Sequence, residues 1–304
     1  MLTCFDIGGS RIKPGFAPAP GQLMPGDAFA TPGDFTGFVA GLARCVVPGS
    51  RGVSIAVAGV MAPETGVMQA ANVAAINGRA LVVELRAALG LPVWVANDAD
   101  CFALAEAVSG AGAGHRNVFG IILGTGVGGG LVIDGRIVTG AGGYAGEWGH
   151  GPVLNTKLAG LGLEIPHFPC GCGLAGCVDT VGGARGIEQL HRHLFGAGLT
   201  SPLIVADWLD GEPSALLTVQ AWLELVSGPL ALVLNVTGSS VVPVGGGLAS
   251  VPELIAALDA AVQAKVLRGR LLPVADGSLL VPAAHRIEPG LIGAALLGFQ
   301  GLAA

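Results

Sequence analysis

Hydrophobic residues along the chain form short runs that alternate with longer segments of helical periodicity. Short apolar runs bounded by glycine predict buried strands, and apolar positions spaced three and four residues apart predict helices that pack on them. In the first part of the chain the predicted strands are Leu2–Phe5, Arg11–Phe16, Val53–Ala58 and Val93–Ala96, and the predicted helices are Asp34–Val47, Leu81–Leu89 and Asp98–Val108. This alternation is typical of an α/β protein.

The second part of the chain continues the alternation. Its predicted strands are Val118–Leu123, the two arms of a hairpin that turns at Asp134-Gly135, and Val241–Val244, and its predicted helices are Gly186–Phe195, Ser214–Val236, Pro252–Val266 and Pro289–Phe299. A strand, a glycine turn and a second strand occur near the start of each part. We therefore expect two similar lobes, 1–115 and 116–288, with the boundary near residues 112–116.

Composition identifies a folded chain without a membrane helix. Of 304 residues, 52% are hydrophobic and 12% are charged, which excludes disorder driven by charge. The uncharged run Leu225–Pro252 is long enough to span a bilayer, but Pro229 and the glycines at 245–247 interrupt it, so it predicts a buried helix, a turn and a strand. The N-terminus lacks the basic and apolar regions of a signal peptide, and we expect a cytoplasmic protein.

The charge balance argues against nucleic acid as a partner. There are 15 Lys and Arg residues against 21 Asp and Glu, a net charge of -6, and the basic residues are scattered along the chain. A protein that binds a phosphate backbone needs a basic stripe or patch. We expect small-molecule ligands instead.

Glycine is abundant, with 52 residues that gather at strand ends. The run GTGVGGG contains a G-x-G-x-x-G spacing at Gly124, Gly126 and Gly129, but it leads into a predicted hairpin, whereas a dinucleotide site needs a helix there. No Lys-Ser or Lys-Thr follows a glycine run, which excludes a P-loop. Backbone N–H groups in each glycine turn can form a nest for anionic oxygens, suited to a nucleoside triphosphate. The alternative is that both are simple tight turns.

Three of the six cysteines lie together in CGCGLAGC, at Cys170, Cys172 and Cys177. In a reducing compartment such a cluster predicts a metal site, and strained disulfides are the other way to satisfy it. Zinc in a closed structural site accepts three sulfurs and one imidazole. Both His150 and His167 are candidates for the fourth ligand.

Asp98 is a candidate general base. It follows the short predicted strand VWVA and begins a helix, so its carboxylate stands at a strand end. Phosphoryl transfer needs an oriented hydroxyl, a group that accepts its proton, and neutralisation of phosphate charge. The alternative is that Asn97 and Asp98 only cap the helix, and Asp100 is expected to compensate the helix dipole.

Six motifs occur in an order that resembles the ROK family of sugar kinases. They are DIGGS at 6–10, NDAD at 97–100, LGTGVGGG at 123–130, GEWGH at 146–150, CGCGLAGC at 170–177 and VGGG at 244–247. The resemblance covers nearly the whole chain and is strongest to members that act on N-acetylglucosamine. It implies a two-lobed, actin-like (ribonuclease H-like) fold with ATP and sugar in a cleft between the lobes. It also implies a C-terminal helix, 289–304, packed on the first lobe, and a homodimer.

The resemblance implies roles for particular residues. Asp98 is the base, Mg²⁺ accompanies ATP, and zinc is held by Cys170, Cys172, Cys177 and, as the family pattern indicates, His150. The expected sugar ligands are Asn97, Glu147, His150, Asp179, which stands where the family usually has Glu, and Asn72, whose alternative is a solvent-facing loop residue. The expected ATP-binding residues are Asp6, Gly8, Gly9, Ser10, Gly124, Thr125, Gly126, Gly128, Gly245 and Gly246.

The expected reaction is ATP-dependent phosphorylation of the 6-hydroxyl of N-acetylglucosamine. Nineteen residues, 151–169, separate His150 from Cys170 and resemble an insertion of the kinases that use this sugar. The insertion has the alternative of packing on the lobe or forming a dimer contact. Glucokinase and N-acetylmannosamine kinase remain open, as does a sugar-binding regulator without catalysis. A family repressor would carry a DNA-binding motif ahead of Asp6.

Overall fold

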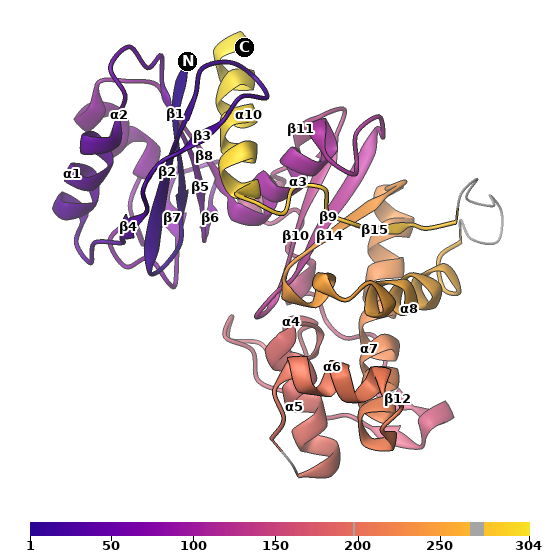
Figure 1. Ribbon diagram of the computed structural model, residues 1–304. Helices are drawn as coiled ribbons and strands as arrows, with labels where there is room; N and C mark the ends of the chain where they lie inside the picture. Colours follow the sequence, from indigo (N-terminus) through magenta and orange to yellow (C-terminus); the bar gives the residue numbers. More distant parts are fainter. Residues whose placement is uncertain (197, 268–276) are drawn as a thin grey trace. The chain divides into compact units, whose positions relative to one another are not determined.

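The computed structural model describes residues 1–196, 198–267 and 277–304 (Figure 1). They form two compact units. Unit 1 comprises Met1–Gly114, Gly130–Gly146 and Ala284–Ala304, and unit 2 comprises His115–Gly129 and Glu147–Ala283. The predicted second lobe, 116–288, includes 130–146 and 284–288, whereas both segments belong to unit 1.

Unit 1 is built on a mixed sheet with strand order β3-β2-β1-β5-β8, with β4 also paired to β2. Strand β1 is antiparallel to β2 and parallel to β5, and β5 is parallel to β8. The strands are β1 (Leu2–Ile7), β2 (Arg11–Ala17), β3 (Met24–Pro25), β4 (Phe29–Ala30), β5 (Val53–Val57) and β8 (Val93–Asn97). The helices are α1 (Phe35–Cys45), α2 (Leu81–Leu89), α3 (Asp98–Ser109) and α10 (Pro289–Ala303), and the small elements are β6 (Val60–Met61), β7 (Met68–Gln69), β11 (Arg136–Ile137) and the 3-10 turn η1 (Ala141–Gly143).

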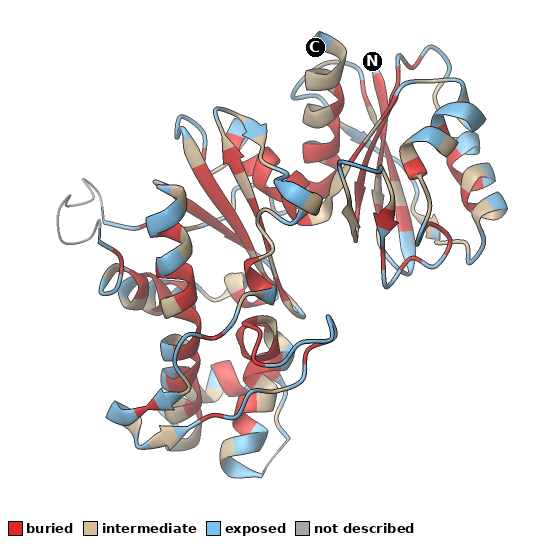
Figure 2. Ribbon diagram, turned by 180° about the vertical axis from the view of Figure 1, so that it is seen from behind, coloured by how far each residue is buried: buried red, intermediate tan, exposed pale blue. Residues whose placement is uncertain are grey.

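Alternation along β1 produces a core on each face of this sheet, because successive side chains point to opposite faces. Phe5 and Ile7 join the cluster formed with α1 and α2, while Leu2 and Cys4 join the cluster formed with α10 and Cys101 of α3. In Figure 2 the strands at the centre of the sheet are coloured as buried. Asp6 has the parity of Leu2 and Cys4, so its side chain lies on the α10 face.

The C-terminal helix α10 packs on α3, β1 and β5 within unit 1, and Figure 1 shows it beside β1. Small residues make this close packing possible. A Cβ atom at Gly293 would collide with the carbonyl group of Cys101, and one at Gly290 would lie 2.9 Å from the Asp6 carboxyl group. The start of α10 is therefore fixed next to the end of β1.

Unit 2 carries most of a second sheet, of order β11-β10-β9-β14-β15, in which β14 is parallel to both β9 and β15. Its strands are β9 (Asn117–Leu123), β10 (Val127–Ile133), which passes into unit 1 at Gly130, β14 (Val242–Gly245) and β15 (Leu280–Pro282). The helices are α4 (Asp179–Gly182), α5 (Ala184–Phe195), α6 (Ser201–Leu209), α7 (Pro213–Thr237) and α8 (Pro252–Gln263). Short elements are β12 (Lys157–Leu158), β13 (Leu163–Glu164) and the 3-10 turns η2 (Trp148–His150), η3 (Ala159–Leu161) and η4 (Gly247–Ser250).

Helix α7 is long and apolar enough to cross a membrane, judged by length and composition alone. In the structure 56% of its most apolar window is buried, and α7 packs against α5, α6 and α8. Trp222 at its centre is fully buried and donates its indole N–H to the carbonyl of Gly182 at 2.9 Å. The helix ends at Thr237 and a turn leads to β14, as the pattern of Leu225–Pro252 predicts.

Two predictions about glycine are resolved differently. The hairpin turn at Asp134-Gly135 is confirmed, with both residues at positive φ of 52° and 71°. The run 124–130, however, is not one long turn, because β10 begins at Val127 and the last glycines lie inside the strand. A Cβ at Gly130 would lie 2.8 Å from the carbonyl oxygen of Ala99, so glycine there serves close packing. Helix α6 and strand β15 were not predicted from the sequence.

Candidate active site and metal centre

Two carboxylates lie at the same edge of the unit 1 sheet. Asp6 is near the end of β1 and Asp98 directly follows β8, and the parallel register β1-β5-β8 aligns Asp6 with Ala56 and Ala96. Burial raises the pKa of Asp6 to about 6, Lys13 opposes the rise, and Asp98 and Glu288 add to it. Asp6 and Asp98 thus repel one another electrostatically, which is the arrangement that a divalent cation relieves.

Lys13 and Glu288 were not singled out from the sequence. The Lys13 ammonium lies 3.1 Å from the Glu288 carboxylate and 4.0 Å from that of Asp6. Lys13 pairs with Asp6 across β1 and β2, a register that counting outward from the turn at Gly8–Ser10 would have revealed. Glu288 has a positive φ of 50° before α10, and nothing in the sequence pattern indicates this.

Asn97 and Asp98 join β8 to α3. Asn97 is the N-cap: its Oδ1 accepts from the amide of Ala99 at 2.7 Å, and its Nδ2 donates to the carbonyl of Gly59 at 3.1 Å. Asp98 is the first helical residue, and its Oδ1 also faces the Ala99 amide, at 2.9 Å. Asn97 therefore caps α3. Its bonds and the strand end fix the position from which the half-buried Asp98 carboxylate projects.

The first glycine turn, Gly8–Ser10, is braced from two directions. The Gly8 amide donates to the Arg11 carbonyl at 3.0 Å, and the Thr31 hydroxyl donates to the Gly8 carbonyl at 2.8 Å. A Cβ at Gly9 would lie 2.7 Å from the carbonyl oxygen of Asn72. The structure thus brings the exposed Asn72 to this turn, together with Asp6 in the same unit.

The second glycine turn, Gly124–Gly126, lies in unit 2 against the VGGG segment. Gly246 has a φ of 93°, and a Cβ there would collide with the backbone of Leu123 and Gly124. Gly124 donates within the turn to the Gly126 carbonyl at 3.0 Å, and Thr125 is exposed at the tip. Gly128 lies in β10, and its carbonyl accepts from the indole N–H of the buried Trp148 at 2.9 Å.

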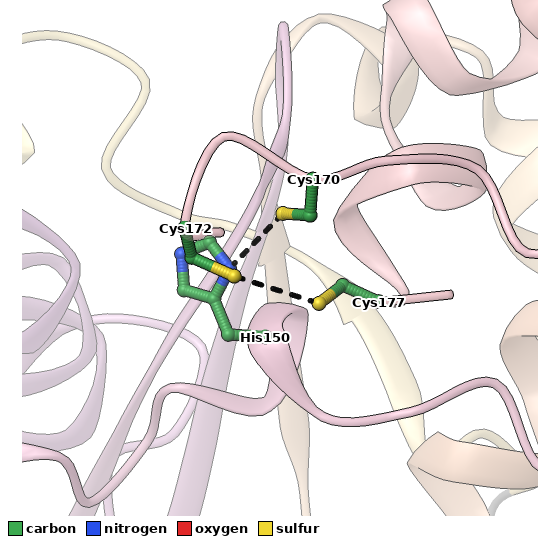
Figure 3. A group of neighbouring side chains, drawn as sticks. All are labelled: His150, Cys170, Cys172 and Cys177. Atoms are coloured by element: carbon green, nitrogen blue, oxygen red, sulfur yellow. Dashed lines mark hydrogen bonds between the residues drawn. The ribbon is translucent and has the colours of Figure 1, made fainter. Parts of the chain in front are cut away.

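His150 and the three clustered cysteines form a compact set of ligand atoms, all within 4.8 Å of one another (Figure 3). The Nδ1 of His150 lies 3.6 Å from the sulfur of Cys170, and the sulfurs of Cys172 and Cys177 are 3.7 Å apart. Four ligands around zinc at about 2.3 Å would be roughly 3.7 Å apart, whereas a disulfide needs about 2.05 Å. The donor set fits a closed tetrahedral zinc site.

His167 is placed elsewhere. Its ring lies beside Gly176, where a Cβ would approach the ring to 2.8 Å, and it is not part of the ligand set.

Burial raises the pKa of Cys177 to about 12 and also raises the pKa of Cys170, while hydrogen bonding from the Leu174 amide lowers that of Cys172. A bound cation would be needed to hold all three as thiolates.

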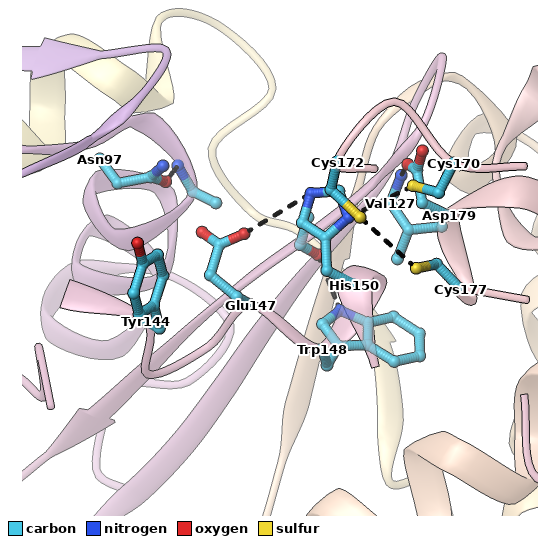
Figure 4. A network of polar contacts seen from close by, with 12 residues as sticks. Asn97, Val127, Tyr144, Glu147, Trp148, His150, Cys170, Cys172, Cys177 and Asp179 are labelled. Atoms are coloured by element: carbon cyan, nitrogen blue, oxygen red, sulfur yellow. Dashed lines mark hydrogen bonds and ion pairs between the residues drawn. The ribbon is translucent and has the colours of Figure 1, made fainter. Parts of the chain in front are cut away.

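Glu147 stands on the opposite side of the His150 ring from the sulfurs. The Nε2 atom of His150 lies 4.0 Å from a Glu147 oxygen, as Figure 4 shows. Burial raises the pKa of Glu147, and the nearby His150 opposes the rise. A His150 that binds metal through Nδ1 carries its proton on Nε2, which then points toward Glu147.

Asp179 is the first residue of α4, two residues after Cys177. Its Oδ1 accepts from the backbone amide of Val127 at 2.7 Å (Figure 4). Within unit 2 the structure therefore brings together the second glycine turn, Gly245 and Gly246, the Glu147–His150 segment, the cysteines and Asp179. Unit 1 contains Asp6, the first glycine turn, Asn72, Asn97 and Asp98.

Comparison with known proteins places these residues in a family. A model of the ROK family matches residues 38–300. The N-acetyl-D-glucosamine kinase of Escherichia coli O6:H1 (strain CFT073) is 35% identical over 304 residues, covering 98% of this chain and 99% of that protein. The ROK hexokinase from Thermus thermophilus is 26% identical with a TM-score of 0.84, covering 99% of both chains.

A second solved structure extends the comparison to a complex. The ROK family glucokinase from Streptomyces griseus, solved with glucose and AMPPNP, is 26% identical with a TM-score of 0.75, covering 99% of both chains. The actin-like, two-lobed α/β fold predicted from the sequence is confirmed by these likenesses. On the family match and the full-length identity together, the chain belongs to the ROK family.

Proposed function

We propose that this chain is an ATP-dependent sugar kinase that phosphorylates the 6-hydroxyl of N-acetylglucosamine. The observation that carries the proposal is Asp98, a carboxylate fixed at the end of β8 in a chain that is 35% identical to a protein named N-acetyl-D-glucosamine kinase. Asp98 accepts the proton of the sugar hydroxyl as that oxygen bonds to the γ-phosphorus of ATP, and the bond from this phosphorus to the β–γ bridging oxygen breaks to release ADP. No covalent intermediate is needed, because positioning and charge neutralisation dominate phosphoryl transfer.

The proposed substrate-binding residues come from both units, which we propose to be the two lobes of the kinase. The two glycine turns, with Gly245 and Gly246, bind the phosphates, and Asp6 would help to hold the magnesium ion that accompanies ATP. The proposed sugar ligands are Asn72, Asn97, Glu147, His150 and Asp179. Asn97 binds the sugar through the part of its side-chain amide that the capping bond leaves available, since that bond already uses one lone pair of Oδ1.

Zinc has a structural role in this proposal. His150, Cys170, Cys172 and Cys177 fill all four positions of a tetrahedral site, so no position is open for substrate. The metal would hold the Glu147–His150 segment and α4 in place and would take no part in the reaction. We also propose, from the family, a homodimer that acts in the cytoplasm.

The test is a coupled ATP-consumption assay over N-acetylglucosamine, glucose, N-acetylmannosamine and mannose, with the product position read by NMR. We expect kcat/KM for N-acetylglucosamine at least about tenfold above that for glucose, because a pocket that hydrogen-bonds the acetamido group is left with unpaired polar groups by glucose. Asp98→Asn, purified in parallel, controls for contaminating kinases. Higher efficiency with glucose or N-acetylmannosamine would reassign the substrate, and no turnover of any hexose would reject the kinase.

A further inference from the structure

The second glycine turn is held in place by the segment where α4 ends and α5 begins. The first amides of α5, those of Ala184 and Arg185, donate to the carbonyls of Gly124 and Thr125 at 2.8 and 3.2 Å. The junction of α4 and α5 lies so close to the turn that a Cβ at Gly183 would be 2.7 Å from the Gly126 backbone. The turn is therefore anchored through its carbonyl groups.

Asp179 adds the contact that fixes the end of the turn. Its Oδ1 accepts from the amide of Val127, where β10 begins, at 2.7 Å. The same carboxylate occupies the space where a side chain on Gly126 would lie. One carboxylate oxygen thus sets the conformation of both residues that lead from the turn into the strand.

The segment that carries Asp179 is itself well anchored. The Val178 amide donates to the Gly151 carbonyl at 2.9 Å, and the Thr180 hydroxyl donates to the Cys177 carbonyl at 2.7 Å. Cys177 belongs to the metal ligand set. Asp179 has a short side chain and is the first residue of α4. Its carboxylate therefore couples the position of this segment to that of the turn.

We propose that Asp179 is a positioning residue for the glycine turn Gly124–Gly126, acting through its bond to the Val127 amide, whatever its Oδ2 contributes to sugar. The consequence for ATP rests on the proposed function, in which this turn binds the phosphates. The bond to Val127 does not depend on that function. Asp179 therefore sets affinity for nucleotide as well as affinity for the sugar acceptor.

The test combines hydrogen exchange with kinetics on the full-length, metal-loaded protein. Asp179→Ala should raise the exchange rate of the Val127 amide, and the KM for ATP, about tenfold, since a hydrogen bond to a charged group is lost. Asp179→Asn keeps an acceptor at the same place and should restore both to within about threefold. Zinc content measured in parallel verifies that the fold and cluster survive.

The matched control is Glu188→Ala. Glu188 also accepts one backbone amide, that of Ser201 at 2.8 Å, and should leave the Val127 amide and the KM for ATP unchanged. Unchanged exchange at Val127 in Asp179→Ala, a change only in the KM for sugar, or failure of Asp179→Asn to restore protection would overturn the proposal. If the wild-type protein phosphorylates no sugar, the proposed function fails, and the exchange measurement still decides the role of Asp179.

Discussion

The proposed functional residues of unit 1 and those of unit 2 are held by different means. Asp6 and Asp98 stand at the ends of β1 and β8, strands of a sheet with a core on both faces. Glu147 and the proposed metal ligands lie in the segment 147–177, which runs from the start of η2 to the residues before α4 and in which the strands are two residues long and the 3-10 turns three. A sheet positions side chains through many backbone bonds, whereas the second segment depends on a few cross-links.

The electrostatics of the two regions also differ. In unit 1, carboxylates are crowded together, and burial raises the pKa of Asp6 at a cost to the folded state. In unit 2, buried thiols whose pKa values are raised stay protonated until a cation displaces their protons. We therefore expect unit 1 to lose function but keep its fold when its acids are changed, and the segment 147–178 to lose its structure with its metal.

The largest expected effect is in unit 1. Asp98→Asn keeps the shape of the side chain and its bond to the Ala99 amide but cannot accept a proton. Turnover should fall about 10²- to 10⁴-fold, the usual contribution of a general base, while sugar affinity measured by calorimetry survives. The thermal midpoint should stay close to that of the wild type.

Asp34→Asn is the matched control for Asp98→Asn. Asp34 caps α1 in the same unit by accepting from the Gly37 amide at 2.9 Å, and Asn is as good a cap as Asp. This variant should turn over at the wild-type rate. Turnover of Asp98→Asn within a few-fold of the wild type would remove Asp98 from the role of base.

The second effect tests the cross-links of unit 2. Elemental analysis of dialysed protein should find one zinc per chain, and Cys172→Ser should lose it. Because the binding energy of a structural metal contributes to folding, the free energy of unfolding should fall by several kcal/mol and sugar affinity should weaken. Limited proteolysis should cut within 147–178 while the unit 1 sheet stays intact.

Cys45→Ser provides the comparison for that variant, since Cys45 lies at the end of α1, outside the ligand set. It should retain zinc, stability and sugar affinity. A wild-type protein that is active and folded but holds no metal would show that the thiol cluster does not need one.

The same contrast explains which features the sequence could predict. Alternation and helical spacing are local signals, so they predicted β1, β5, β8 and α3 and, with them, the strand-end position of Asp98. The spacing of the cysteines predicted a cluster, and the structure selects His150 over His167 as its fourth member. That selection depends on how the chain between residues 150 and 177 folds back, which no periodicity encodes.

Other features were missed because they depend on close packing. The glycines at 128–130 were assigned to a turn because glycine is a strong turn signal. At Gly130 the close approach of α3 to β10 leaves no room for a Cβ atom, which only tertiary structure reveals. The bond from Asp179 to Val127 joins residues 52 positions apart and has no sequence signal. Helix α6 was missed because the short apolar segment that follows Pro202 is equally compatible with a loop.

The smallest of these effects concerns the cost that unit 1 incurs at Asp6. The pKa of this carboxyl is raised from 3.8 to about 6, chiefly by burial. In the unfolded chain Asp6 loses its proton near pH 3.8, while the folded protein retains it until about pH 6. The stability that the protonated carboxyl contributes is therefore fully present below pH 3.8 and is lost as pH rises through 6. Above that pH the deficit is about 3 kcal/mol.

Asp6→Asn removes the titration and keeps a polar group of the same size. In magnesium-free buffer its free energy of unfolding should match that of the wild type near pH 4 and exceed it by about 3 kcal/mol at pH 7.5, because only the wild type must ionise a buried group. Lys13→Met should move the midpoint of the wild-type pH dependence upward, since the Lys13 ammonium opposes the rise. Thermal unfolding from pH 4 to 8 measures both. A gain for Asp6→Asn that is the same at every pH would mean that packing, and not the charge on Asp6, destabilises this end of β1.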